Sequence, residues 1–381
     1  MRFNPELYFM EATMRRISIL LLILFTLFAS AAWPQAQPQW KHKIITYDVP
    51  GAGNGAGQGT QAFGINSSGE VAGFYTDANS VNHGFLRKPN GTFKKFDPAG
   101  STNTFVIGIN NEGAIPGWYY DANNMMHGFL RARDGAITTF DAPGAGTGAN
   151  QGTIAGDLND LGAIAGYYID TNNVSHGFVL NPDGNFTTLD AAGAGTAAGQ
   201  GTFPMFFSCL TDFGASTGYY VDANNASHGF VLNPDGSITT FDAPLAGTGA
   251  GQGTYGESIN RGGASTGYYV DENNVDHGFL LSPEGSIITI NVRRAGTGAG
   301  QGTVAEGNNA EGAIVGQYYD ANSVMHGFLR ATDGKITIFD APGAGTGAGQ
   351  GTQPMTNNGE GAISGFYLDA NNVYHGFLRI P

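Results

Sequence analysis

One tripeptide, His-Gly-Phe, recurs seven times along this 381-residue chain, and its spacing constrains the fold more than any other feature. Successive histidines are 44, 49, 52, 49, 49 and 49 residues apart. The seven copies are at His83, His127, His176, His228, His277, His326 and His375. A period of about 50 residues is typical of repeat architectures, in which each copy is one structural unit that packs on its neighbours. We therefore expect a single repeat domain over residues 41–381.

The third copy shows what one unit contains. Short stretches of alternating apolar and polar residues at 153–159, 163–170, 175–181 and 186–190 predict four strands. Asp183-Gly184 between the last two predicts a type I′ hairpin. After the N-terminal region the chain has no apolar pattern of helix length. The sequence thus predicts an all-β fold, a seven-bladed β-propeller of four-stranded antiparallel blades.

The two ends of the chain indicate how the ring closes. The seventh copy stops at Pro381, before the strand that ends the other copies, and a strand of that type stands alone at residues 44–48. A lone sheet leaves two faces and two edges uncovered, and only neighbours on both sides bury the faces. We therefore expect the N-terminal strand to complete the last blade.

The N-terminal region has the features of an export signal. Residues 15–31 contain two arginines, an apolar run and an Ala-Ser-Ala cleavage pattern. They predict a signal peptide at 1–31 and a linker at 32–40, and the acidic residues before the apolar run indicate Met14 as the true start. We expect a secreted or cell-surface protein, with the periplasm and an uncleaved anchor as alternatives. No segment of the mature chain is apolar enough to span a membrane.

Charge and cysteine content narrow the classes of partner. The net charge of −14 disfavours nucleic acid and anionic membranes, whose phosphates an acidic surface repels. Cys209 is the only cysteine, so the chain forms no internal disulfide and must be stabilised by packing. We expect a monomer that binds an extracellular protein or glycan.

The repeated histidines each follow an acidic residue by six positions. These acids are Asp77, Asp121, Asp170, Asp222, Asp271, Asp320 and Asp369. The spacing matches no standard zinc motif, and a catalytic site seldom needs seven copies. We interpret the acids as caps of hairpin turns and the histidines as their hydrogen-bonding neighbours. We predict no cofactor; calcium bound by the glycine-rich connectors between copies is the alternative.

Functional residues are best sought where the copies differ. The first strands of copies three, five and six hold Asp157, Glu257 and Glu306, which would gather in the central channel if these strands line it. The alternative is that the three are solvated charges at loop edges. Arg293 and Arg294 form a local basic spot in the connector after copy five.

Two further copies differ from the repeat pattern in length and not in charge. The connector after Asp97 is five residues short, which predicts a notch in the rim, and copy four carries an apolar insertion around 206–209. The chain offers no Ser-His-Asp order, zinc cluster or carboxylate pair at a known catalytic spacing, so we predict no catalytic residue.

The repeats resemble the bacterial extracellular HAF family, which is named for a His-Ala-Phe core. The resemblance rests on 65–69 (Ile-Asn-Ser-Ser-Gly), 71–73 (Val-Ala-Gly) and 83–86 (His-Gly-Phe-Leu), with Gly replacing Ala in all seven copies. It implies an exported protein and carries no established activity. We expect a non-enzymatic binding scaffold. The alternatives are a polysaccharide-active enzyme and a structural component of the envelope or matrix.

Overall fold

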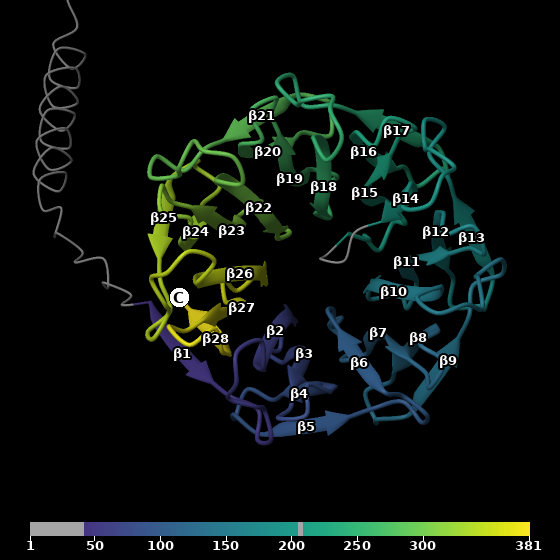
Figure 1. Cartoon of the computed structure of the whole chain (residues 1–381), viewed down its shortest axis with the longest axis horizontal. Helices are drawn as coiled ribbons and strands as arrows, with labels where there is room; N and C mark the ends of the chain where they lie inside the picture. Colours follow the sequence, from purple (N-terminus) through teal and green to yellow (C-terminus); the bar gives the residue numbers. More distant parts are fainter. Residues whose placement is uncertain (1–41, 205–208) are drawn as a thin grey trace, which may run out of the picture. The chain divides into compact units, whose positions relative to one another are not determined.

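The structure is a computed structural model that describes residues 42–204 and 209–381; the predicted signal peptide and linker and residues 206–208 of the copy-four insertion lie outside these ranges. His42–Pro381 form one compact unit, in which small sheets are arranged in a ring (Figure 1). All regular elements in the described ranges are strands. Within those ranges, no helix is long and apolar enough to cross a membrane.

The 28 strands fall into four positions from the centre of the ring to its rim (Figure 1). The innermost are β2 (Gly59–Ile65), β6 (Asn103–Val106), β10 (Gly152–Leu158), β14 (Gly201–Pro204), β18 (Gly253–Ile259), β22 (Gly302–Asn308) and β26 (Gly351–Asn357). The second are β3 (Val71–Thr76), β7 (Ile115–Tyr120), β11 (Ile164–Ile169), β15 (Ser216–Val221), β19 (Ser265–Val270), β23 (Ile314–Tyr319) and β27 (Ile363–Leu368). The third are β4 (Asn82–Arg87), β8 (Met126–Arg131), β12 (Ser175–Leu180), β16 (Ser227–Leu232), β20 (Asp276–Leu281), β24 (Met325–Arg330) and β28 (Tyr374–Ile380). The outermost are β5 (Phe93–Phe96), β9 (Ile137–Phe140), β13 (Phe186–Leu189), β17 (Ile238–Phe241), β21 (Ile287–Ile290), β25 (Ile336–Phe339) and β1 (Lys43–Tyr47).

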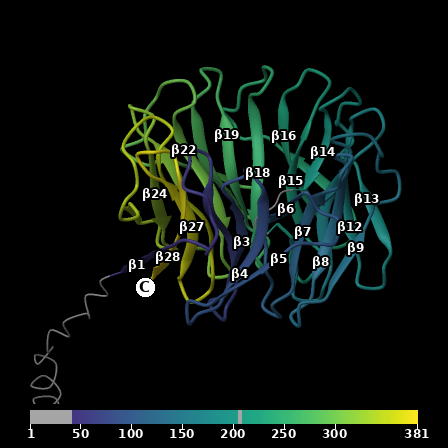
Figure 2. The same ribbon diagram turned by 60° about the horizontal axis from the view of Figure 1, so that its bottom comes forward.

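The strands fit seven four-stranded blades, which we number from β2 to β5 onwards, so that blade seven consists of β26, β27, β28 and β1. Neighbouring strands within a blade are antiparallel, as in β2–β3, β3–β4 and β4–β5. The strands run between two faces of turns and connectors (Figure 2). The all-β prediction is confirmed, and the four strands predicted for copy three match β10 to β13 to within a residue or two at each end.

The first and last strands of the domain pair with each other, as the missing strand of the seventh copy predicts. β1 is antiparallel to β28, with Ile45 opposite Leu378. The Asp48 carboxylate lies 2.9 Å from Nδ1 of His375. Thr356 of blade seven donates a 2.7 Å hydrogen bond to the Phe63 carbonyl of blade one. Blade seven therefore contains strands from both ends of the domain and is hydrogen-bonded to blade one.

The third turn of copy three differs from the type I′ hairpin that Asp183-Gly184 predicts. The Gly184 amide donates to the Asn181 carbonyl, so the central residues of the turn are Pro182 and Asp183. Gly184 has a φ of 86°, whereas Asp183 is not among the residues with positive φ. A type I′ turn needs positive φ at both central residues, and proline is restricted to negative φ. The loop is therefore a type I turn followed by a glycine bulge.

The repeated aspartates cap the second turn of each copy, as predicted. In blade three, Oδ1 of Asp170 accepts hydrogen bonds of 2.8 Å from the amides of Asn172 and Val174. Asn173 completes the turn with a φ of 62°, a left-handed conformation that asparagine tolerates. Burial alone would raise the pKa of Asp170, but these hydrogen bonds outweigh it and lower the pKa below its ordinary value.

The repeated histidines link that turn to the outer strand. Nδ1 of His176 lies 3.0 Å from Asp190, and its Nε2 lies 3.8 Å from Asp170. The ring stacks on Tyr168 at a centroid distance of 5.0 Å. The same arrangement recurs in the other blades, with Asn291 replacing the outer aspartate in blade five. Each repeated histidine thus lies between two polar side chains of its own blade, one in the capped turn and one at the end of the outer strand.

The core lies between adjacent blades. The phenylalanine of every His-Gly-Phe is fully buried at 0% exposure: Phe85, Phe129, Phe178, Phe230, Phe279, Phe328 and Phe377. Phe377 of blade seven packs in one cluster with Val315 of blade six and Ala341 of the connector between them. Apolar burial of this kind contributes about 1.5–3 kcal/mol for each large side chain.

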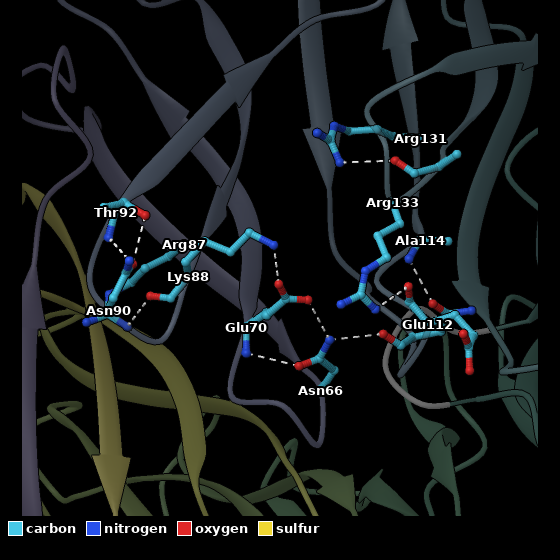
Figure 3. Close-up of polar contacts among 12 residues, drawn as sticks. Asn66, Glu70, Arg87, Lys88, Asn90, Thr92, Glu112, Ala114, Arg131 and Arg133 are labelled. Atoms are coloured by element: carbon cyan, nitrogen blue, oxygen red, sulfur yellow. Dashed lines mark hydrogen bonds and ion pairs between the residues drawn. The ribbon is translucent and has the colours of Figure 1, made fainter.

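A second link between blades is a belt of asparagine side chains at the first turn. The Asn66 amide donates to the Asn110 carbonyl at 3.2 Å, and also to Glu70, which pairs with Lys88 (Figure 3). Asn110 in turn donates to the Asn159 carbonyl. The belt is interrupted at blade four, where threonine replaces the asparagine. The sequence indicated only a turn at these positions.

Steric contact explains why the middle residue of His-Gly-Phe is glycine. A Cβ atom added to Gly128 would lie 2.5 Å from the ring of Phe140 on the neighbouring outer strand. In blade five the outer-strand residue is Ile290. The three atoms nearest to a Cβ atom on Gly278 would be the Ile290 carbonyl oxygen at 3.1 Å and the Cβ atoms of Ala305 and Ile290 at 3.4 Å, none of them aromatic.

We expect Gly128→Ala to destabilise the domain by roughly 1–3 kcal/mol, because overpacking forces a buried ring to move. Gly278→Ala is the matched control and should cost clearly less. Chemical denaturation of the two variants measures the difference. Equal losses would refute the steric explanation.

Removal of β1 tests closure. We expect a chain beginning at Gly51 to lose several kcal/mol of stability, since it lacks Tyr47 and the buried Val49, each contributing about 1.5–3 kcal/mol when fully buried. A chain beginning at His42 is the control and should melt like the whole protein. Calorimetry provides the comparison, and identical melting of both shortened chains would show that the β1–β28 pairing contributes nothing.

Candidate functional site: an acidic cavity in the channel

A β-bulge in the innermost strand sets the geometry of the site. The register with the second strand skips one residue in five blades, for example between Gly256 and Ser258 and between Ala305 and Gly307. The skipped residues are Phe63, Gly156, Glu257, Glu306 and Met355. A bulge leaves its extra residue unpaired and redirects that side chain. Glu257 and Glu306 therefore occupy equivalent positions in adjacent blades.

Both glutamates line one cavity at the inner strands. Its volume is about 490 Å³, and blades five, six, seven and one contribute to its wall. Blade five supplies Glu257, Tyr255, Tyr268 and Asp276. Of the acidic residues that we expected to gather at the first strands, Glu257 and Glu306 line this one cavity and are buried, with exposures of 4% and 7%.

The two carboxyl groups differ in their partners. Oε1 of Glu306 accepts a 2.9 Å hydrogen bond from the Gln317 amide. Oε2 of Glu257 is buried and has no hydrogen-bond partner in the described part of the chain. A buried polar atom without a partner is costly and rare in folded proteins.

Burial controls the protonation of this pair. It raises the pKa of Glu306 to about 7. Burial, and then the nearby charge of Glu306, raise the pKa of Glu257 well above its ordinary value. No lysine or arginine is among the residues that line the cavity. Near neutral pH the two carboxyl groups are thus partly protonated. A positively charged or hydrogen-bond-donating group in the cavity would stabilise their ionised form.

Gln317 is a residue that the sequence analysis missed. Six copies carry an aromatic residue at this position of the second strand: Phe74, Trp118, Tyr167, Tyr219, Tyr268 and Phe366. Only blade six has an amide, and that amide contacts Glu306. Aligning the copies column by column would have found this exception.

Tyrosines form the blade-five wall of the cavity. Tyr255 and Tyr268 stack with ring centroids 4.8 Å apart and an interplanar angle of 8°. Burial first, and then Glu257, raise the pKa of Tyr268. Burial raises the pKa of Asp276 to about 6. Aromatic rings beside carboxyl groups are common features of sites for cations and for sugars.

The third acidic candidate, Asp157, lies elsewhere. It follows the bulge residue of blade three by one position, and its Oδ2 accepts a 3.0 Å hydrogen bond from the Leu210 amide of blade four. Burial raises its pKa to about 7. Asp157 is therefore buried, not a solvated loop-edge charge, and it joins two blades instead of lining the cavity of Glu257.

The remaining candidates do not reach the cavity. Arg293 and Arg294 are exposed in the connector between β21 and β22. Cys209, the described end of the copy-four insertion, is fully buried. Across the described ranges, no group of three or more His, Cys, Asp and Glu residues is arranged to hold a metal ion.

Comparison with known proteins identifies the fold and no family. No family model and no curated protein matches the chain. A streptogramin B lyase structure is similar over 89% of this chain and 98% of its own, with a TM-score of 0.52 and 15% identity. A lectin from Burkholderia pseudomallei has a TM-score of 0.46 at 10% identity over 87% and 98% of the two chains. The fungal lectin of Aleuria aurantia, a six-bladed β-propeller, has a TM-score of 0.42 at 13% identity over 78% and 94%.

At such identities the likeness concerns the fold alone. This chain is an all-β protein of tandem repeats with a β-propeller arrangement. The resemblance to HAF repeats stays a prediction.

The raised pKa values predict how stability depends on pH. Glu306 binds more protons in the folded than in the unfolded chain, because its pKa rises from 4.5 to about 7. The stability that this extra proton binding gives relative to high pH is complete below pH 4.5 and is lost as pH rises through about 7, roughly 3–4 kcal/mol in total.

We therefore expect Glu306→Gln to flatten the fall in stability of the protein between about pH 5 and 8. Urea denaturation across this range measures the slope. Glu284→Gln removes an exposed acid in the same half of the ring and should leave the slope unchanged. A Glu306→Gln slope equal to that of the unmodified protein would show that this carboxyl titrates normally.

Proposed function

We propose that this protein is an exported, non-enzymatic binding protein, a closed seven-bladed propeller whose ligand site is the cavity of Glu257 and Glu306. The export signal in the sequence supports the location, which includes the cell surface or the periplasm. The propeller supplies a rigid frame, and function depends on the residues that break its symmetry.

The observation that supports this proposal most strongly is the unpartnered carboxyl oxygen of Glu257. The same bulge position is Phe63 in blade one and Met355 in blade seven, so the fold accepts an apolar residue there. A buried carboxyl without a partner costs stability that an apolar residue would not. A ligand group that enters the cavity would supply the missing partner.

The seventh copy suggests a decisive substitution. Glu257→Met copies the residue of Met355, and we expect the unliganded protein to become more stable by about 1–4 kcal/mol, because replacing buried ionisable groups with apolar residues often has this effect. The same variant should lose ligand binding. Thermal melting and crystal soaks with oligosaccharides and amines measure both effects.

Glu284→Gln should change neither property. Destabilisation by Glu257→Met, with ligand binding intact, would make Glu257 a structural residue and overturn the proposal. An array of glycans and proteins extends the search to larger partners, and chelation of calcium before melting tests the connector alternative.

An enzyme is the second candidate, and one observation favours it. The interacting carboxyls of Glu257 and Glu306 both have raised pKa values, and a pair of carboxyls with perturbed pKa values is the arrangement used by acid–base pairs. Turnover of a polysaccharide that disappears in both Glu257→Gln and Glu306→Gln would establish this alternative. A purely structural role would instead leave the cavity empty in every soak.

A further inference from the structure

The cavity has two chemically different walls. Blades five and six present Glu257, Glu306 and Asp276. The bulge positions of the next two blades, seven and one, present Met355 and Phe63, which belong to a buried apolar cluster. The same bulge thus contributes carboxyl groups from two blades and apolar groups from two others.

Resting on the proposed function, we infer that the ligand is an amphipathic organic ammonium: a protonated amine held by Glu257 and Glu306, attached to an apolar body that contacts Phe63 and Met355. The cavity has room for a compact organic molecule, since its volume of about 490 Å³ falls within the usual range of roughly 300–1,000 Å³ for ligand pockets.

Two features favour an ammonium group over a neutral hydroxyl group. Three carboxyl groups line the cavity without a lysine or arginine among the lining residues. The Oε2 atom of Glu257 has no hydrogen-bond partner among the described residues, and once this carboxyl is ionised a positively charged N–H donor satisfies both its charge and its free oxygen.

Gln317 makes the two carboxyl groups of Glu257 and Glu306 unequal as acceptors. Its amide donates to Glu306 and thereby occupies one oxygen of that carboxyl. Glu257 keeps an oxygen available. The ammonium is therefore expected to contact Glu257 most closely, with Glu306 as the second acceptor.

Binding of an ammonium is coupled to proton release. The ionisable groups that interact with Glu257 are Glu306 on β22, the tyrosines of three inner and second strands, and the buried thiol of Cys209; these tyrosines are Tyr219, Tyr255 and Tyr268. Asp276 on β20 and Tyr319 on β23 line the same cavity. Because burial holds the carboxyls partly protonated near neutral pH, the cation must displace a proton. Affinity should therefore rise as pH increases from 6 to 8.

The test uses titration calorimetry with 3-phenylpropylamine and its neutral counterpart 3-phenylpropan-1-ol as probes. We expect the amine to bind at least tenfold more tightly than the alcohol, with an affinity that increases between pH 6 and 8 and a heat that depends on the buffer. Glu257→Gln and Glu306→Gln should each weaken the amine at least tenfold, whereas Glu284→Gln should not.

A capped lysine peptide and the free amine distinguish two sources of the same ammonium chemistry. Tighter binding of the peptide would point to a protein partner, and tighter binding of the free amine to a small molecule; both outcomes support an ammonium ligand.

Other outcomes overturn the inference. Equal affinity of amine and alcohol, no response to the amine at millimolar concentration, or Glu257-dependent stabilisation by calcium chloride alone would each do so. A neutral oligosaccharide that binds in a Glu257-dependent manner while the amine does not would leave the proposed function standing and remove the ammonium. Amine binding that is unaffected in both glutamine variants would overturn the inference and the cavity together.

Discussion

Every blade of this protein needs a neighbour on each of its two faces, and the remaining structure depends on this requirement. The phenylalanine of each His-Gly-Phe is fully buried in the packing between blades. An open row of sheets would expose this apolar surface at both ends. The pairing of β1 with β28, reinforced by Asp48 and His375, avoids that exposure by joining residues more than 300 positions apart. The chain has a single cysteine, so strand pairing and packing hold the two ends of the domain together without an internal disulfide.

The β-bulge shows how a symmetric frame acquires an asymmetric site. The same β-bulge is repeated in the inner strands of several blades. In four of these blades its extra residue lines the cavity. Where that side chain is Phe63 or Met355, it contributes to an apolar cluster; where it is Glu257 or Glu306, it creates a buried pair of acids. The site therefore requires no new element of the fold, only different residues at one position of the repeat.

Local sequence signals were reliable wherever the interacting groups are close along the chain. The Asp-capped turn before each histidine was predicted because its donors lie two and four residues after the aspartate. The type I′ prediction failed because it considered Asp183 and Gly184 and ignored Pro182, whose fixed φ selects a type I turn. The belt of asparagines was missed because each amide bonds to a carbonyl of another blade, as Asn66 does to Asn110. Asp157 lies apart from the two glutamates and lines a different pocket, because it follows its bulge by one position and a shift of one residue changes where a side chain points.

The sequence by itself determined the all-β class, the repeat unit, the residues that face the core and the terminal strand that completes the last copy. These properties follow from periodicity and from turn residues, both of which act over a few positions. Only the tertiary structure decided that Glu257 and Glu306 share a cavity, that Gln317 contacts one of them and that Phe63 and Met355 line the same cavity. Curvature of the ring and the position of each bulge bring these residues together, and both arise from contacts between blades that no short stretch of sequence contains.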